Sequence, residues 1–132
     1  AGTIRYFDQE TGAFVRKKFP KIINDICEAF GAKAEIDYKE GYPPTINDKN
    51  AAKFALDTAK EIAGKNASIN QVPMMGSEDF SYFLQEKPGA YAWIGNGNSA
   101  SLHNPSYDFN DEVLPIGASF LSRIAENALN KN

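Results

Sequence analysis

The first third of the chain combines strand-like alternation with helix-like spacing of apolar residues. Residues 2–7 are rich in β-branched and aromatic side chains, which is typical of a short strand. Apolar side chains then recur every three or four positions from residue 19, which predicts a helix with one apolar face. Asp8 can cap its start, Gly31 can end it, and Pro20 should kink it or mark a restart. The apolar face consists of Phe19, Ile22, Ile23, Ile26, Cys27 and Phe30.

Residues 32–38 alternate apolar and charged side chains, which predicts a strand with one face in water. Together with the preceding segments they form a strand, helix, strand unit. Pro43 and Pro44 then break the pattern, because proline cannot continue a sheet and stiffens the backbone. We interpret this break as a domain crossing between residues 1–42 and residues 43–132.

The second part of the chain again alternates predicted helices and strands. Asn47 or Asp48 should cap an alanine-rich helix that runs to about residue 63, and residues 69–72 could form a short strand. The buried stripe of this alanine-rich helix should contain Ala52, Ala55, Ala59 and either Ile62 or Ala63. A short helix over residues 78–84 should follow the turn at Gly76.

The last predicted strand and helix flank a polar loop. Residues 89–95 are almost all apolar, as in a strand covered on both faces. Residues 96–101 have the composition of a mobile loop, and a helix should begin near Asp111. The expected apolar face of this helix contains Leu114, Gly117, Leu121, Ile124 and Ala128. The sequence therefore predicts an α/β fold.

Composition excludes some functions. The net charge of −3 gives no electrostatic footprint for a nucleic acid partner. The chain has no apolar run long enough to span a membrane and no leader-like start, so we expect a cytoplasmic protein without a membrane role. Cys27 is the only cysteine, so it cannot form an internal disulfide, and we expect it in the core.

His103, the only histidine, lies in the polar loop and has two interpretations. A lone loop histidine more often fixes the backbone by a hydrogen bond than binds a ligand. With carboxylates near it in sequence, an imidazole would also suit zinc or manganese. One histidine cannot build the usual three-ligand zinc site, so other ligands would have to come from another segment.

Glu78 and Asp79 follow Gly76 at the expected start of a helix. Capping and the helix dipole would favour carboxylates there without any functional role. The alternative is a site, in which only one of the two adjacent side chains could take part. The sequence offers no serine, threonine or cysteine with a recognisable base partner, so we identify no nucleophile.

Five runs of the sequence resemble the C-terminal portion of the metal-dependent amidohydrolases, a group that includes hippurate hydrolase, bacterial N-acyl-amino-acid amidohydrolases and plant hydrolases of auxin conjugates. The resemblance covers nearly the whole chain, in order. The runs are Gly-Thr-Ile-Arg-Tyr-Phe-Asp (2–8), Ala-Phe-Gly-Ala (29–32), Gly-Tyr-Pro-Pro-Thr-Ile-Asn-Asp (41–48), Met-Gly-Ser-Glu-Asp-Phe-Ser-Tyr-Phe-Leu (75–84) and Leu-His-Asn-Pro-Ser-Tyr-Asp-Phe-Asn-Asp-Glu-Val-Leu-Pro-Ile-Gly (102–117).

The resemblance implies a fold and an assembly. Residues 1–42 would be the second half of a ferredoxin-like lid that also forms a homodimer contact. Residues 43–132 would be the C-terminal part of a zinc-peptidase-like α/β catalytic domain. The enzyme would cleave the amide bond of N-acyl amino acids at a site with two divalent metal ions, zinc or manganese.

The resemblance also assigns residues. His103 matches the last metal ligand, whereas the other ligands and the catalytic residues would lie on the rest of the polypeptide. Gly76, Glu78 and Asp79 match a signature that we expect to shape the substrate pocket. Tyr42 is a further candidate for the substrate pocket. It stands where carboxypeptidase-like relatives place an arginine, which argues against a dipeptidase or carboxypeptidase. The isolated chain should be inactive.

Two alternatives remain open. The chain could be a non-catalytic binding or dimerisation module that has lost its metal site and pairs through its sheet edges. It could also belong to an enzyme of the same family with another substrate, such as a dipeptidase or a desuccinylase. The coding sequence upstream of Ala1 would separate the module from the enzyme.

Overall fold

The computed structural model describes residues 1–69 and 72–130, which fall into two compact units. The first unit contains Ala1–Ile46 and Val72–Lys87, and the second contains Asn47–Gln71 and Pro88–Asn132. Each unit is therefore made of two segments that are separate in the sequence. The division predicted between residues 42 and 43 stays a prediction.

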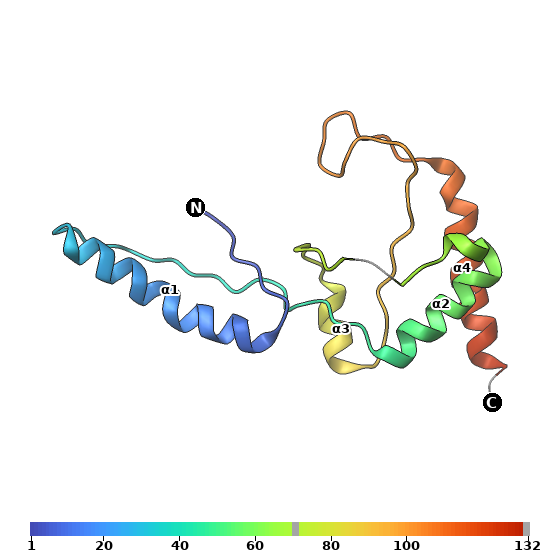
Figure 1. Cartoon of the computed structure of the whole chain (residues 1–132), viewed down its shortest axis with the longest axis horizontal. Helices are drawn as coiled ribbons and strands as arrows, with labels where there is room; N and C mark the ends of the chain where they lie inside the picture. The colour runs from blue at the N-terminus through green and yellow to red at the C-terminus, as the bar shows by residue number, and fades with distance from the viewer. Residues whose placement is uncertain (70–71, 131–132) are drawn as a thin grey trace. The chain divides into compact units, whose positions relative to one another are not determined.

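Helix α1 (Gln9–Ala29) dominates the first unit (Figure 1). The Asp8 carboxylate caps it by accepting a hydrogen bond from the Thr11 backbone N–H at 2.7 Å. Gly31 ends it with a φ of 67°, a left-handed conformation that glycine adopts without strain. The predicted start and stop are thus confirmed. The helix runs through Pro20 as one element, so a restart there is wrong.

The chain returns along α1 after its last turn (Figure 1), and two contacts hold the flanking segments to the helix. The Phe19 and Tyr38 rings meet at a tilt with 6.0 Å between their centroids. Buried Gly12 lies so close to the Tyr6 ring that a Cβ there would stand 2.5 Å from a ring carbon. A glycine at this position therefore lets the N-terminal segment approach the helix.

Helix α3 (Phe80–Glu86) completes the first unit. The Phe80 and Phe83 rings stack on it at 5.6 Å, and the Tyr82 ring meets Tyr42 edge to face at 5.9 Å. The Tyr42–Tyr82 contact joins the chain on both sides of residues 47–71, which belong to the second unit.

The second unit is built on the helix pair α2 and α4, which lie side by side (Figure 1). Asp48 caps α2 by accepting from the backbone N–H groups of Asn50 and Ala51, which confirms that predicted start. The elements are α2 (Lys49–Ala63), the 3₁₀ turns η1 (Gly64–Asn66) and η2 (Asp111–Val113), and α4 (Leu114–Leu129).

A buried polar contact links α2 to α4. Thr58 has no exposed surface, and its hydroxyl accepts a hydrogen bond from the Asn127 amide at 3.2 Å. The same amide donates to a Glu61 carboxylate oxygen at 3.0 Å. Ile94 reaches the other end of α4, where its Cδ1 would lie 3.2 Å from a Cβ on Gly117.

The predicted α/β class, including the strand, helix, strand half of a ferredoxin-like lid, is wrong for the described residues, whose regular elements are all helical. Residues 2–7, 32–38 and 89–95, expected as strands, carry no strand pairing there. The expected strand at 69–72 includes residues 70 and 71, which lie outside the described residues. A strand exists only through a ladder of hydrogen bonds to a second strand, and alternation in sequence does not supply that partner.

The expected apolar core is also wrong. No apolar side chain among the described residues is buried. Residues 89–95 are not covered on both faces, since Trp93 remains 59% exposed. Cys27 is half-buried rather than in a core, and Leu121 on the expected buried face of α4 is 67% exposed. Helix spacing predicted which side chains share a face, but within each unit too little packs against those faces to bury them.

Candidate functional site

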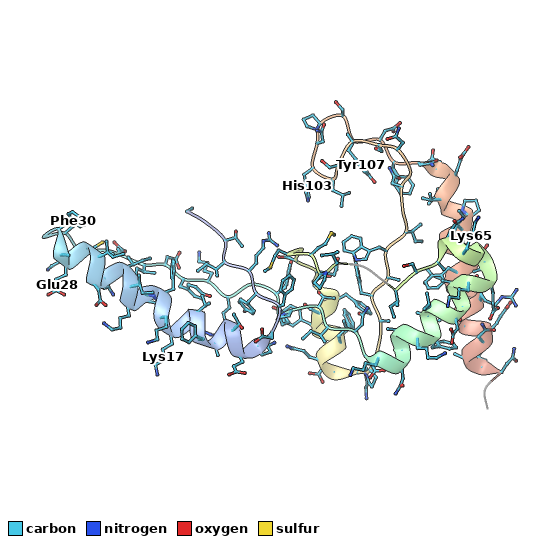
Figure 2. The ribbon with its side chains drawn as sticks, viewed as in Figure 1. Lys17, Glu28, Phe30, Lys65, His103 and Tyr107 are labelled. Atoms are coloured by element: carbon cyan, nitrogen blue, oxygen red, sulfur yellow. The ribbon has the colours of Figure 1, made fainter. Side chains whose placement is uncertain are left out.

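His103 lies in the loop that joins residue 95 to η2 in the second unit (Figure 2). Its side chain is exposed, and its φ of 67° is the only positive φ of a non-glycine residue among the described residues. Histidine is one of the few side chains enriched in this left-handed region. His103 therefore differs from its neighbours in its backbone conformation as well as in its side chain.

The tip of the loop is organised around Asn104. Its backbone N–H donates to the Ser101 carbonyl at 3.1 Å, and its carbonyl accepts from the Tyr107 N–H at 2.9 Å. Its side-chain oxygen accepts from the Ser106 N–H at 2.8 Å. The first of these bonds closes a turn over residues 101–104 that contains His103, and the other two define the turn that follows it.

Two polar side chains close the neck of the loop, the place where residues 96–99 are hydrogen-bonded to residues 108–110. The Asn96 amide donates to the Asp108 carbonyl and accepts from the Asn110 N–H, each at 2.8 Å. The Ser99 hydroxyl donates to the same Asp108 carbonyl at 3.0 Å. We did not identify Asn96 or Ser99 from the sequence, because hydrogen bonds across nine to fourteen residues leave no pattern in it.

Tyr42 and Gly76 lie in the first unit and line the same hollow, which has a volume of about 270 Å³. Arg5 and Ser77 line it as well. The Arg5 guanidinium donates to the Met75 carbonyl and to the Ser77 hydroxyl, both at 2.7 Å. An arginine from the N-terminal segment thus holds the turn that contains Gly76.

Glu78 and Asp79 occupy the start of α3. A Glu78 carboxylate oxygen accepts from the Phe80 N–H at 3.3 Å, and the Glu78 carbonyl accepts from the Ser81 hydroxyl at 2.6 Å. Asp79 stands at the N-cap position but makes no capping hydrogen bond with its side chain. The Glu78 contacts are those of a residue that starts a helix.

A metal centre was expected to need ligands from outside this chain. Among the described residues, no three histidine, cysteine, aspartate or glutamate side chains come together as a metal site would require. His103 belongs to the second unit, whereas the other four site candidates belong to the first. The described residues therefore do not form a complete metal centre, and His103 as a ligand stays a prediction.

Within residues 1–69 and 72–130, no helix combines the length and the apolar character that a membrane crossing requires.

Residues 4–127 match the family described as Peptidase family M20/M25/M40. Hippurate hydrolase of Campylobacter jejuni is 39% identical over 124 residues, which are 93% of this chain and 32% of that protein. IAA-amino acid hydrolase ILR1-like 4 of Arabidopsis thaliana is 31% identical, over 97% of this chain and 31% of its own length. Thermostable carboxypeptidase 1 of Saccharolobus solfataricus is 29% identical, over 98% of this chain and 34% of its own length. The chain spans about a third of the length of these curated relatives.

Proposed function

This chain belongs to peptidase family M20/M25/M40, and on that premise we propose that it is one segment of a longer hydrolase of N-acyl amino acids. The observation that carries the proposal is the 39% identity, over 93% of this chain, to a protein named hippurate hydrolase. Hippurate is an N-acyl amino acid, and the reaction is hydrolysis of its amide bond. A relative named IAA-amino acid hydrolase supports the same class of reaction.

We propose His103 as one ligand of a centre with two divalent cations, zinc or manganese, that would supply the hydrolytic chemistry. A neutral imidazole is a common ligand for these metals. The exposed ring and the left-handed backbone of His103 support this role, because strained backbone tends to occur at functional sites. The remaining ligands would come from the rest of the polypeptide.

Tyr42, Gly76, Glu78 and Asp79 are our candidates for the wall of the substrate pocket. The shared hollow supports Tyr42 and Gly76. Glu78 would act less directly, by fixing the start of α3 through its contacts with Phe80 and Ser81, and Asp79 is a candidate because it matches the signature in the sequence. None of these four residues would carry out the reaction itself.

The proposed partners of the segment are the rest of its own polypeptide, an N-acyl amino acid and a second copy of the enzyme that contacts it through residues 1–42. The many exposed apolar side chains support an assembly that covers them, because large exposed apolar surfaces usually mark contact sites. We propose a cytoplasmic location for the complete enzyme.

Hippurate cleavage by two purified proteins tests the proposal. The longer polypeptide that contains this chain should release glycine from hippurate in the presence of zinc or manganese and lose the activity with a chelator. The 132-residue chain alone should release none. Zinc-dependent cleavage by the isolated chain, or none by the longer polypeptide with either metal, would contradict it.

A further inference from the structure

We propose that Asn96 and Ser99 are positioning residues that close the neck of the loop and hold His103 ready to bind a metal ion. This inference rests on the proposed role of His103. Neither side chain touches the imidazole in the described contacts, so both would act through the backbone that carries it.

Asn96 closes the neck as a strand partner would. Its planar side-chain amide offers one acceptor and one donor, as a peptide group does. It uses both on the opposite arm of the loop, by donating to the Asp108 carbonyl and accepting from the Asn110 N–H. The two bonds, each 2.8 Å long, fix where residues 108–110 pass the residue that begins the loop.

Ser99 adds a second link at the same place. Its hydroxyl donates to the Asp108 carbonyl at 3.0 Å and lies 3.4 Å from the Asp108 N–H, from which it accepts. The Asp108 carbonyl therefore receives two side-chain donors, one from Asn96 and one from Ser99. This arrangement holds the neck from two positions in the chain.

The closed neck matters because His103 lies in the loop that the neck closes, inside the turn that the Asn104 N–H makes with the Ser101 carbonyl. A residue with positive φ keeps that conformation only if the structure around it fixes the backbone on both sides. The Asn104 bonds fix the turn around His103 and the turn after it, and the neck limits the path of the chain that leads to them. An open neck would let the backbone at His103 relax and would add the cost of ordering the loop to metal binding.

Substitution in the longer polypeptide tests the role of the neck. Asn96→Ala should weaken zinc binding, measured by competition with a chelating dye, by about 10- to 100-fold, the usual loss when a residue that orients a metal ligand is removed. It should also speed amide hydrogen exchange at Asn110, whose acceptor is lost. Ser99→Ala should weaken zinc binding in the same direction but less, because its bonds are longer.

Asn98→Ala is the matched control, since it changes the same residue type two positions away. Asn98 is exposed, and within the described part of the chain its side chain makes no hydrogen bond. Its zinc affinity and exchange rates should equal those of the wild type. If Asn98→Ala weakens zinc binding as much as Asn96→Ala, the loss is not specific to the neck and the inference is overturned.

Two further outcomes separate this inference from the proposed function. If His103→Ala keeps the zinc affinity of the wild type, the ligand role fails, and this inference fails with it. If His103→Ala loses zinc while Asn96→Ala loses less than about tenfold, the ligand role stands and the positioning role is overturned. Should Asn96→Ala fail to fold, unchanged zinc affinity in Ser99→Ala overturns the inference, and weakened affinity supports it.

Discussion

Replacing Asn127 by alanine should destabilise the α2–α4 pair more than removing the Thr58 hydroxyl that Asn127 contacts. Asn127→Ala takes away the donor to Thr58, whose oxygen has no access to water, and the donor to Glu61. A buried polar group left without its partner costs about 1–3 kcal/mol, so we expect the pair to lose about that much.

Thr58→Val removes the acceptor of the same hydrogen bond, whereas Asn127→Ala removes its donor. Valine keeps the shape of threonine and removes the buried oxygen, while Asn127 keeps its bond to Glu61. Because no buried oxygen is then left without a partner, the loss should be below about 1 kcal/mol. The double variant should cost less than the sum of the two single variants, since both remove the same bond.

Native-state hydrogen exchange of α2 and α4 amides in the longer polypeptide measures both losses as free energies of local opening. It is preferred to global unfolding, because a protein with several domains does not unfold in one step. A Thr58→Val loss equal to or larger than that of Asn127→Ala would refute the argument about the buried oxygen. Strict additivity in the double variant would refute the proposed contact.

Three further predictions concern α1. The pKa of Asp8 is lowered first by the hydrogen bond that its carboxylate accepts from the Thr11 backbone N–H and then by the bond from the Thr11 hydroxyl. The Asp8 cap therefore stabilises the helix fully above the ordinary pKa of an aspartate, and this stabilisation is lost as the pH falls through the lowered pKa. NMR titration of the Thr11 amide should show this low-pH loss, and Asp8→Asn should flatten it. Gly12→Ala should push the Tyr6 ring off the helix and cost about 1–3 kcal/mol, measured by hydrogen exchange in α1. Gly31→Ala should cost about 1–2 kcal/mol by the same measurement, because alanine is strained at a φ of 67°; an equal loss for an exposed mid-helix substitution would contradict that cause.

Local signals in the sequence predicted the helices well. Asp8, Asp48 and Gly31 mark helix ends because capping needs only neighbouring backbone groups. The alternation over residues 32–38 also predicted side-chain placement, although no sheet forms there. Its half-buried members are Ala34, Ile36 and Tyr38, and its exposed members are Lys33, Glu35 and Asp37, whereas Ala32, expected on the apolar side, is exposed.

Contacts between distant positions could not be predicted in the same way. Alternation states which side of a segment is covered but not which segment pairs with it, so the expected strands had no ladder. The candidate site shows the same difference between local signals and contacts of distant residues. His103 could be identified because it is the only histidine, whereas Asn96 looked like one polar residue among many until its bonds to Asp108 and Asn110 were seen.

Anomalous diffraction from zinc-loaded crystals of the longer polypeptide would test the central claim most directly. If His103 is a ligand, one nitrogen of its ring should lie about 2.0–2.1 Å from a zinc ion. Zinc ions bound elsewhere, with the His103 ring turned toward solvent, would contradict the account.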